Sequence, residues 1–224
     1  MAPADGLGST APGPLRVAVV DDDPSFLRSL TRSLARDGIL VHGFDDGPAL
    51  LAYLAEQDPE AAHFDAILVD LNLPSMRGDE VIAALGARGI PVVAATISAW
   101  VDGDGEARSR QAGALHVVGK TQAQMLIDTA RVTAAVTRER RAAAQRRTRH
   151  ARARVSLTEV RDFAASEAER ERIVWALAQC WGSVNDAARM LSHDRSNLYR
   201  RMSRLGLRAA AFARPGRDSD EPAH

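Results

Sequence analysis

Residues 17–20 read Val-Ala-Val-Val and lead directly into Asp21, Asp22, Asp23 and Pro24. A short apolar run that ends in polar residues is typical of a buried strand. An aspartate followed by a proline suits the N-cap and first position of a helix, and the next glycine along the chain offers a stop. The stretch therefore predicts a buried strand joined by a very short loop to a helix.

The same alternation continues through the first half of the chain. Further strands are expected at residues 39–42, 66–69, 92–95 and 115–118, and further helices at residues 48–56, 79–87 and 106–112. Short strands that alternate with helices predict βαβ units and a parallel sheet. We therefore expect a doubly wound five-stranded α/β domain over residues 15–130, preceded by a loose leader at residues 1–14.

The composition changes after this domain. Residues 131–154 hold nine arginines and a single acidic residue, Glu139, and neither proline nor glycine occurs from Lys120 to Trp181. Such a stretch favours helix, which we expect to begin at Thr121 and to run into an arginine-rich helical linker over residues 131–156. Two interpretations of this linker stay open: a solvated tether, or a segment that contacts nucleic-acid phosphates.

The last part of the chain predicts a small all-α domain over residues 157–212, followed by a disordered tail at 213–224. Ser166 and Glu169 have capping-box spacing, and the helix that they start would end at Gly182. Ser183 and Asp194 can cap two further helices, the last ending at Gly206. The short break at residues 192–194 between those two helices is typical of a helix-turn-helix.

The charges separate these two parts. The whole chain has zero formal net charge, yet residues 1–130 hold 9 basic and 18 acidic side chains and residues 131–224 hold 20 and 11. Such asymmetry indicates domains with different partners. No run of 18 apolar residues and no signal peptide is present, and Cys180 is the only cysteine, which excludes an internal disulfide. These features predict a cytoplasmic protein without a membrane partner.

Polar side chains follow four of the five expected strands. Asp21 and Asp22 follow the first strand, Asp70 the third, Thr96 the fourth and Lys120 the fifth. The carboxyl ends of parallel strands meet at one edge of the sheet, where ligands bind. An aspartate after a strand is often only a helix cap, but the joint pattern favours a site. Clustered carboxylates predict Mg²⁺, and a carboxylate with a metal and a lysine can accept a phosphoryl group.

These residues resemble the receiver domain of bacterial two-component response regulators. The resemblance rests on Val19-Val-Asp-Asp22, on Leu68-Val-Asp-Leu-Asn-Leu-Pro74 with Gly78, on Thr96, and on Gly113-Ala114 before Lys120. It implies a flavodoxin-like sheet of order 2-1-3-4-5, with Asp70 as the phosphoacceptor for a sensor histidine kinase. Mg²⁺ would be held by Asp22, Asp70 and the backbone carbonyl of Asn72, with Asp21 acting through water. Thr96 and Lys120 would sense the phosphoryl group.

Three positions depart from the receiver pattern. Ile97 follows Thr96 where the family has a small residue, Val117 replaces the aromatic residue three positions before the lysine, and Thr121 replaces the usual proline after it. The usual coupling between a threonine and an aromatic residue therefore cannot operate here. Apart from its own phosphoryl transfer and slow autodephosphorylation, no enzymatic activity is expected.

The second half of the chain carries a candidate DNA-reading helix. Leu198, Met202 and Leu205 have the spacing of a buried helical face. The residues expected to contact DNA are Arg195, Ser196, Asn197, Tyr199, Arg200, Arg201 and Arg204. A merely solvated basic helix is the simpler alternative.

Residues 167–207 resemble the Fis-type helix-turn-helix of nitrogen-regulator class activators. The similarity lies in Gly182, in Asp186-Ala-Ala-Arg189 with Leu191, in Arg195-Ser-Asn-Leu-Tyr-Arg-Arg-Met202 and in Leu205-Gly-Leu207. It implies a homodimer on double-stranded DNA with two-fold half-sites. Ser192 stands where the turn usually has glycine and predicts a strained or altered turn. Cys180 and Trp181 are expected in the interface or core.

No central ATPase accompanies the helix-turn-helix. Residues 113–121 resemble a phosphate-binding loop only poorly, with the wrong glycine spacing and position. The layout is similar to short regulators of redox and photosynthesis.

The chain is therefore predicted to be a DNA-binding response regulator phosphorylated on Asp70. One alternative is a phosphorylation-independent DNA-binding regulator whose receiver serves dimerisation. Another is a haloacid-dehalogenase-like phosphatase, for which Asp21 and Asp23 form the required motif and Asp102 and Asp104 are the further acids available. The opposite charges of the two halves also suggest that the receiver docks on the basic half and hinders DNA binding until Asp70 is phosphorylated.

Overall fold

The computed structural model describes residues 13–56, 64–90, 92–100, 102–153 and 156–214. Five parallel strands form one sheet of order β2-β1-β3-β4-β5, which confirms the predicted order. The strands are β1 (Arg16–Val20), β2 (Leu40–Phe44), β3 (Ala66–Asp70), β4 (Ala94–Ser98) and β5 (Val117–Gly119). The expected leader and tail lie almost entirely outside the described residues.

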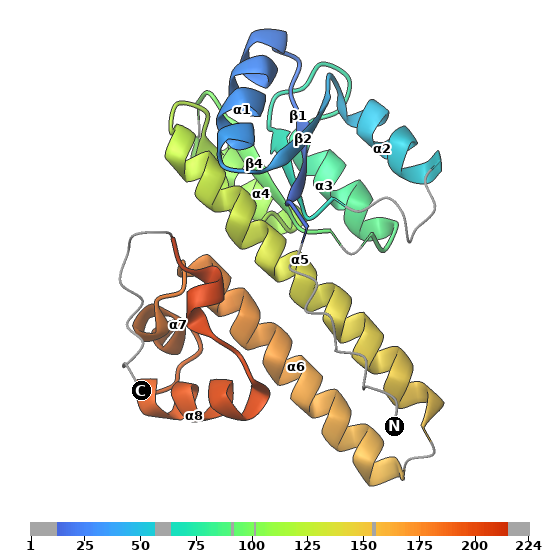
Figure 1. Ribbon diagram of the computed structural model, residues 1–224, viewed down its shortest axis with the longest axis vertical. Helices are drawn as coiled ribbons and strands as arrows, with labels where there is room; N and C mark the ends of the chain where they lie inside the picture. Colours follow the sequence, from blue (N-terminus) through green and yellow to red (C-terminus); the bar gives the residue numbers. More distant parts are fainter. Residues whose placement is uncertain (1–12, 57–63, 91, 101, 154–155, 215–224) are drawn as a thin grey trace, which may run out of the picture.

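Helices cover both faces of this sheet (Figure 1). They are α1 (Pro24–Arg36), α2 (Gly47–Glu56), α3 (Gly78–Ala87), α4 (Gly103–Ala112) and α5 (Ala123–Arg152). Alternate strand residues contribute to two apolar clusters: Ile67 and Val69 pack with α2 and α3, whereas Ala66 and Leu68 pack with α1 and α5. The continuous apolar runs predicted from the sequence are therefore strands buried on both faces.

The fourth strand begins later than predicted. It was expected at residues 92–95 but spans Ala94–Ser98, and the fifth strand is likewise shifted from 115–118 to Val117–Gly119. Just before the strand the Val93 N–H donates to Thr137 Oγ1 on α5 at 2.9 Å, and the strand continues to Ser98. Thr96 consequently lies inside the strand, and the expectation that it follows the strand is wrong.

The fifth receiver helix continues without a break into the arginine-rich segment. Within α5, Ala134 belongs to the receiver core, while Val132 and Val136 belong to the core of the C-terminal domain. Helix α6 (Leu157–Gln179) lies beside the second part of α5 as a hairpin (Figure 1). The predicted linker thus contributes to the cores of both domains through one continuous helix.

The expected start of α6 at Ser166 is wrong, because the capping box forms at Ser156, about three turns earlier. Ser156 Oγ accepts the Glu159 N–H, and the Glu159 carboxylate accepts the Ser156 N–H at 2.7 Å. Ser166 lies within the helix. Its spacing to Glu169 satisfies the same sequence pattern, but the helix already has its cap.

Several arginines of the linker are held by other parts of the chain. Arg141 donates to the Phe64 carbonyl at 2.6 Å, Arg146 pairs with Glu167 at 2.8 Å, and the Arg140 guanidinium lies over the Trp175 ring. Partial burial lowers the pKa of Arg140 and Arg141 from their usual values. These contacts favour a structural role for this segment over contact with phosphates.

The C-terminal domain consists of the end of α6, α7 (Val184–Met190), α8 (Arg195–Leu205) and a short 3₁₀ helix (Ala209–Phe212). The predicted anchors Leu198, Met202 and Leu205 are buried in its core. Ser192 has φ +56°, which confirms the strained turn expected where the family has glycine.

The receiver contacts this domain at the ends of its strands opposite to the aspartates. Gln179 Nε2 donates to the Leu115 carbonyl at 2.6 Å, and the His116 ring stacks on Trp181 with 4.1 Å between centroids. In Figure 1, α8 lies on the side of its domain away from the sheet. This arrangement does not cover α8, so it gives no support to a receiver that blocks the reading helix directly. Among the described residues, no helix is long and apolar enough to cross a membrane.

Candidate functional site

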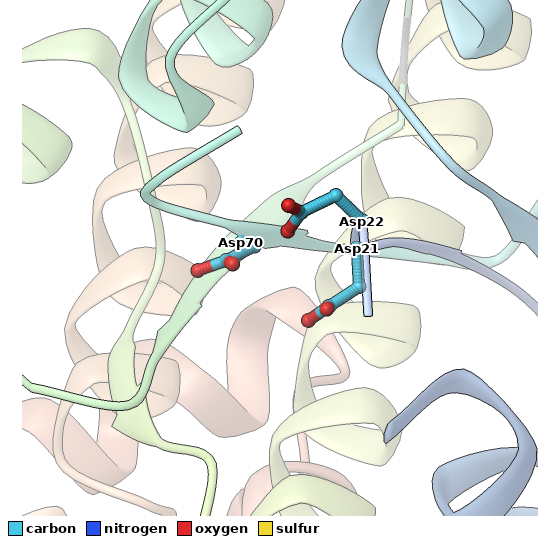
Figure 2. A group of neighbouring side chains, drawn as sticks. All are labelled: Asp21, Asp22 and Asp70. Carbon is cyan, nitrogen blue, oxygen red and sulfur yellow. The ribbon is translucent and has the colours of Figure 1, made fainter. Parts of the chain in front are cut away.

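Three aspartates converge at the carboxyl edge of the sheet (Figure 2). Asp21 and Asp22 follow β1, and Asp70 is the last residue of β3. One carboxylate oxygen from each lies within 4.8 Å of the others. Asp21 is fully buried, Asp70 is nearly so, and Asp22 is exposed. The predicted acidic residues therefore meet in one cluster, which is exposed to solvent at Asp22.

Lys120 bridges the two buried carboxylates. Its Nζ lies 2.6 Å from Asp21 Oδ2 and 2.8 Å from Asp70 Oδ2. Burial lowers the pKa of Lys120, but the hydrogen bonds with the two aspartates outweigh this effect and raise it overall. Burial raises the pKa of Asp21 above its usual range despite the contact with Lys120. One ammonium against three carboxylates leaves an excess of negative charge at this edge.

The donor set fits a small divalent cation. Carboxylate oxygens are hard ligands, and the exposure of Asp22 leaves room for water and a phosphoryl oxygen, as Mg²⁺ prefers. Asn72 lies beside the cluster, since its backbone N–H donates to Asp70 Oδ1 at 3.3 Å. Gly78 packs closely against the backbone of Asp70, because a Cβ there would collide with the Asp70 carbonyl.

A hydroxyl group that the sequence reasoning missed ends the fourth strand. Asp70 pairs with Ile97 in the sheet register, so Ser98 is the residue that continues past it. The Ser98 carbonyl accepts the Lys120 N–H at 2.8 Å, and the Ser98 hydroxyl donates to the Trp100 carbonyl at 2.7 Å. Thr96 lies two residues further into the strand, and both side chains are fully buried. The small residue Ala99 directly after Ser98 was the available signal.

This shift changes one of the three departures from the receiver pattern. The residue after the strand-end hydroxyl is Ala99, so Ile97 no longer occupies the position where the family has a small side chain. Val117 remains, half-buried, in place of the aromatic residue, and Thr121 follows Lys120.

The seven predicted DNA-contacting residues form two groups. Arg195, Ser196 and Arg200 are exposed on α8, and the Arg195 guanidinium lies 5.4 Å from the Tyr199 ring centroid. In contrast, Arg201 and Arg204 both contact the carboxylate of Glu169 on α6. Asn197 links the two groups, because its Oδ1 accepts the Arg201 Nε–H at 2.9 Å.

The acids required by the phosphatase alternative do not join the carboxylate cluster. Asp102 caps α4, where its carboxylate accepts the Gly105 N–H, and Asp104 lies in the first turn of that helix. The described acidic cluster consists of Asp21, Asp22 and Asp70. The aspartates suggested for a phosphatase therefore have a helix-terminal position.

Sequence profiles match both parts of the chain. The profile described as "Response regulator receiver domain" matches residues 17–131, which is more than half of the chain. The profile described as "Bacterial regulatory protein, Fis family" matches residues 164–205. The two matches support a receiver joined to a helix-turn-helix domain, and not the phosphatase alternative.

Individual proteins share the first half of the chain. The Mycobacterium tuberculosis "Transcriptional regulatory protein PrrA" is 37% identical over 107 residues, which cover 48% of this chain and 42% of the relative. The Mycolicibacterium smegmatis "DNA-binding response regulator MtrA" is 39% identical over 82 residues, which cover 36% of this chain and 34% of the relative. The chain therefore matches less than half the length of these curated relatives.

Solved structures share the fold. A CheY-like receiver domain protein from Methanospirillum hungatei has a TM-score of 0.50 at 21% identity and covers 57% of this chain and 98% of its own. A receiver domain of a Luxo repressor protein from Vibrio parahaemolyticus has a TM-score of 0.50 at 20% identity and covers 56% and 93%.

Proposed function

Because this chain belongs to the response regulator receiver domain family, we propose that Asp70 accepts a phosphoryl group from a sensor histidine kinase and that the Fis-type domain then regulates transcription. The observation that carries this proposal is the Lys120 ammonium held between Asp70 and Asp21 at the sheet edge. A carboxylate with a neighbouring cation and oxygen ligands for a metal matches the requirements of phosphoryl transfer.

In the proposed step, an Asp70 oxygen attacks the phosphorus of a phosphohistidine. A P–O bond forms as the P–N bond breaks, and the electron pair of the P–N bond stays on the imidazole nitrogen. Lys120 stabilises the negative charge that builds on the phosphoryl oxygens, and its contact with the Asp70 carboxylate orients that acceptor. Asp22, Asp70 and the Asn72 carbonyl would hold Mg²⁺, with Asp21 acting through water, and the ion would neutralise charge on those same oxygens.

The hydroxyl proposed to sense the phosphoryl group is that of Ser98, in place of Thr96. Ser98 ends the strand and its carbonyl accepts the Lys120 N–H, whereas Thr96 lies two residues earlier in the strand. When Ser98 donates to a phosphoryl oxygen, its hydrogen bond to the Trp100 carbonyl must break. The loop after β4 would change conformation in response.

DNA binding is assigned to the exposed face of α8. Arg195, Ser196, Asn197 and Tyr199 would meet base edges, with Arg200 on phosphates. We propose a homodimer on two-fold half-sites in the cytoplasm, with no enzymatic activity beyond the receiver's own phosphoryl transfer and autodephosphorylation.

The test is the mass of the intact chain, which increases when a phosphoryl group is bound covalently. The full chain incubated with Mg²⁺ and a small phosphodonor should gain one phosphoryl group, and Asp70→Asn should gain none. Binding to DNA selected from random duplexes should rise on phosphorylation of the native chain and stay constant in the variant. No adduct on the native chain, or an adduct that persists in Asp70→Asn, would overturn the assignment.

A further inference from the structure

A single carboxylate on α6 contacts two arginines of the reading helix. Glu169 accepts hydrogen bonds from Arg201 and from Arg204, and its side chain is only 19% exposed. The neighbouring Arg170 donates to the Leu205 carbonyl at the end of the same helix. Helix α6 thus holds the C-terminal half of α8 through side chains as well as through the apolar core.

The contact with Glu169 extends to a residue expected to read bases. Arg201 Nε donates to Asn197 Oδ1 at 2.9 Å, while the Asn197 backbone N–H donates to Asp194 Oδ1 at 2.7 Å. The carboxylate of Glu169, the guanidinium of Arg201 and the amide of Asn197 therefore form a continuous chain. A side-chain amide whose oxygen already accepts one hydrogen bond has a fixed orientation, with its NH₂ group directed to the other side.

The same contacts change the charge that α8 presents. Arginines that share one carboxylate already have part of their charge neutralised, so they release fewer counterions from DNA than arginines without such a partner do. Arg200 is exposed on α8, whereas Arg201 and Arg204 share Glu169, although the Arg204 side chain is itself 65% exposed. This division was not foreseen from the sequence, which places all three on one basic helix.

We propose that Glu169 is a positioning residue for DNA recognition. It holds Arg201 and Arg204 against α6, and through Arg201 it orients Asn197 so that the amide NH₂ donates to a base acceptor in the major groove, such as guanine O6 or N7. This inference rests on the proposed DNA-binding function. It adds that part of the sequence discrimination of α8 is set from α6.

The experiment compares two kinds of DNA with the full chain: duplexes enriched by the native protein from a random library, and the unselected library itself. In Glu169→Gln, the ratio of the two affinities should fall by roughly tenfold, the order of one base contact. On the unselected library, the slope of log K against log salt should steepen by up to about 2, because two guanidiniums become available to phosphates.

Glu171→Gln is the matched control. Glu171 lies two residues along the same helix and pairs with Arg147 in an exposed position. The Glu171→Gln change removes the same charge but affects an ion pair with α5, so the affinity ratio and the salt slope should stay at the native values. A change of equal size in this control would assign the effect to net charge and would overturn the proposal.

A second comparison separates positioning from a general structural role. If Glu169 acts through Asn197, then adding Glu169→Gln to Asn197→Ala should cause no further loss of discrimination. A structural role would instead lower the melting temperature and weaken binding to both kinds of DNA equally. An unchanged ratio in Glu169→Gln, or a full additional loss in the Asn197→Ala background, would overturn the inference. Failure of the native chain to bind any duplex would instead overturn the proposed function.

Discussion

The two proposed functional sites of the molecule have opposite arrangements of charge. At the sheet edge one cation, Lys120, lies between the carboxylates of Asp21 and Asp70. At the reading helix one carboxylate, Glu169, lies between the guanidiniums of Arg201 and Arg204. Each site keeps an excess of the charge opposite to its proposed ligand: Asp22 remains exposed toward a cation, and Arg200 remains exposed toward phosphates.

The difference between the two sites is burial. Asp21 and Asp70 are buried with Lys120, so each charge there depends strongly on its partner. Arg201 and Arg204 retain substantial exposure, and ion pairs of that kind contribute little to stability. Changes at the sheet edge should therefore affect chemistry strongly, whereas changes at the helix should affect mainly recognition.

The largest effect is expected from Lys120→Gln. Loss of the ammonium removes the protein's cation from the transferring oxygens, and phosphorylation of Asp70 by a small phosphodonor should slow by about 10²–10³-fold. Mg²⁺ should bind more tightly to this variant, because a competing positive charge has gone. The rate of mass increase and a Mg²⁺ titration measure the two effects.

Arg131→Gln is the control for Lys120→Gln, because it also removes a cation from a pair with an aspartate. Arg131 contacts Asp37 at 2.7 Å on the surface, away from the cluster. Its phosphorylation rate should match that of the native chain. A Lys120→Gln chain that reacts as fast as this control would contradict the role given to the ammonium.

The second-largest effect concerns the contact between the receiver and the C-terminal domain. His116 directly precedes β5, stacks on Trp181 and bonds to the Ala178 carbonyl at 3.1 Å. Burial lowers its pKa from 6.5 to about 4. Between these values the unfolded chain binds a proton that the folded chain does not, so the free energy of unfolding falls as pH drops from 6.5 toward 4. Below pH 4 the free energy of unfolding is lower by about 3 kcal/mol than it is above pH 6.5 because of this one group.

His116→Gln should remove this pH dependence, since glutamine can bond to the same carbonyl without titrating. The measurement is the denaturant midpoint of the native chain and of the variant between pH 7 and pH 4. If both lose stability in parallel over this range, His116 is not the group responsible.

The third effect separates the two candidate hydroxyls at the sheet edge. Ser98→Ala should reduce the phosphorylation-dependent gain in DNA affinity by about tenfold, the order of one hydrogen bond to a charged group, whereas Thr96→Ala should leave it unchanged. Trp100 is 80% exposed and its carbonyl holds Ser98. Its fluorescence should change on phosphorylation in the native chain but not in Ser98→Ala, with Trp100→Phe identifying the signal. The opposite assignment of effects would restore Thr96.

The sequence predicts the acidic edge correctly, because a residue that directly follows a buried parallel strand lies at the carboxyl edge of the sheet. Asp21, Asp22, Asp70 and Lys120 all reach the expected edge. The error at Thr96 arises because residues 92–98 are apolar or small throughout and do not mark where the strand starts. The hydrogen bond next to the start of the strand joins Val93 to Thr137, which is 44 residues away along the chain.

For the reading helix, too, local sequence does not predict contacts with residues distant along the chain, in this case the ion pairs of its arginines. Local spacing predicts its buried face correctly, because helical periodicity depends on neighbours along the chain. It cannot predict which arginines are paired, because Glu169 lies 32 residues from Arg201 and 35 from Arg204. Only the packing of α6 against α8 distinguishes Arg201 and Arg204, which share Glu169, from Arg200.

The smallest effect tests this distinction directly. Arg200→Ala removes an exposed guanidinium, so on unselected DNA the magnitude of the salt slope should fall by about 0.9 and the affinity should fall modestly. Arg201→Ala removes a guanidinium already paired with Glu169, so its slope should stay near the native value while discrimination between selected and unselected DNA falls. Salt titrations of both variants on the same duplexes measure this. If Arg201→Ala lowers the slope as much as Arg200→Ala, both arginines contact phosphate, and the pairing with Glu169 breaks when DNA binds.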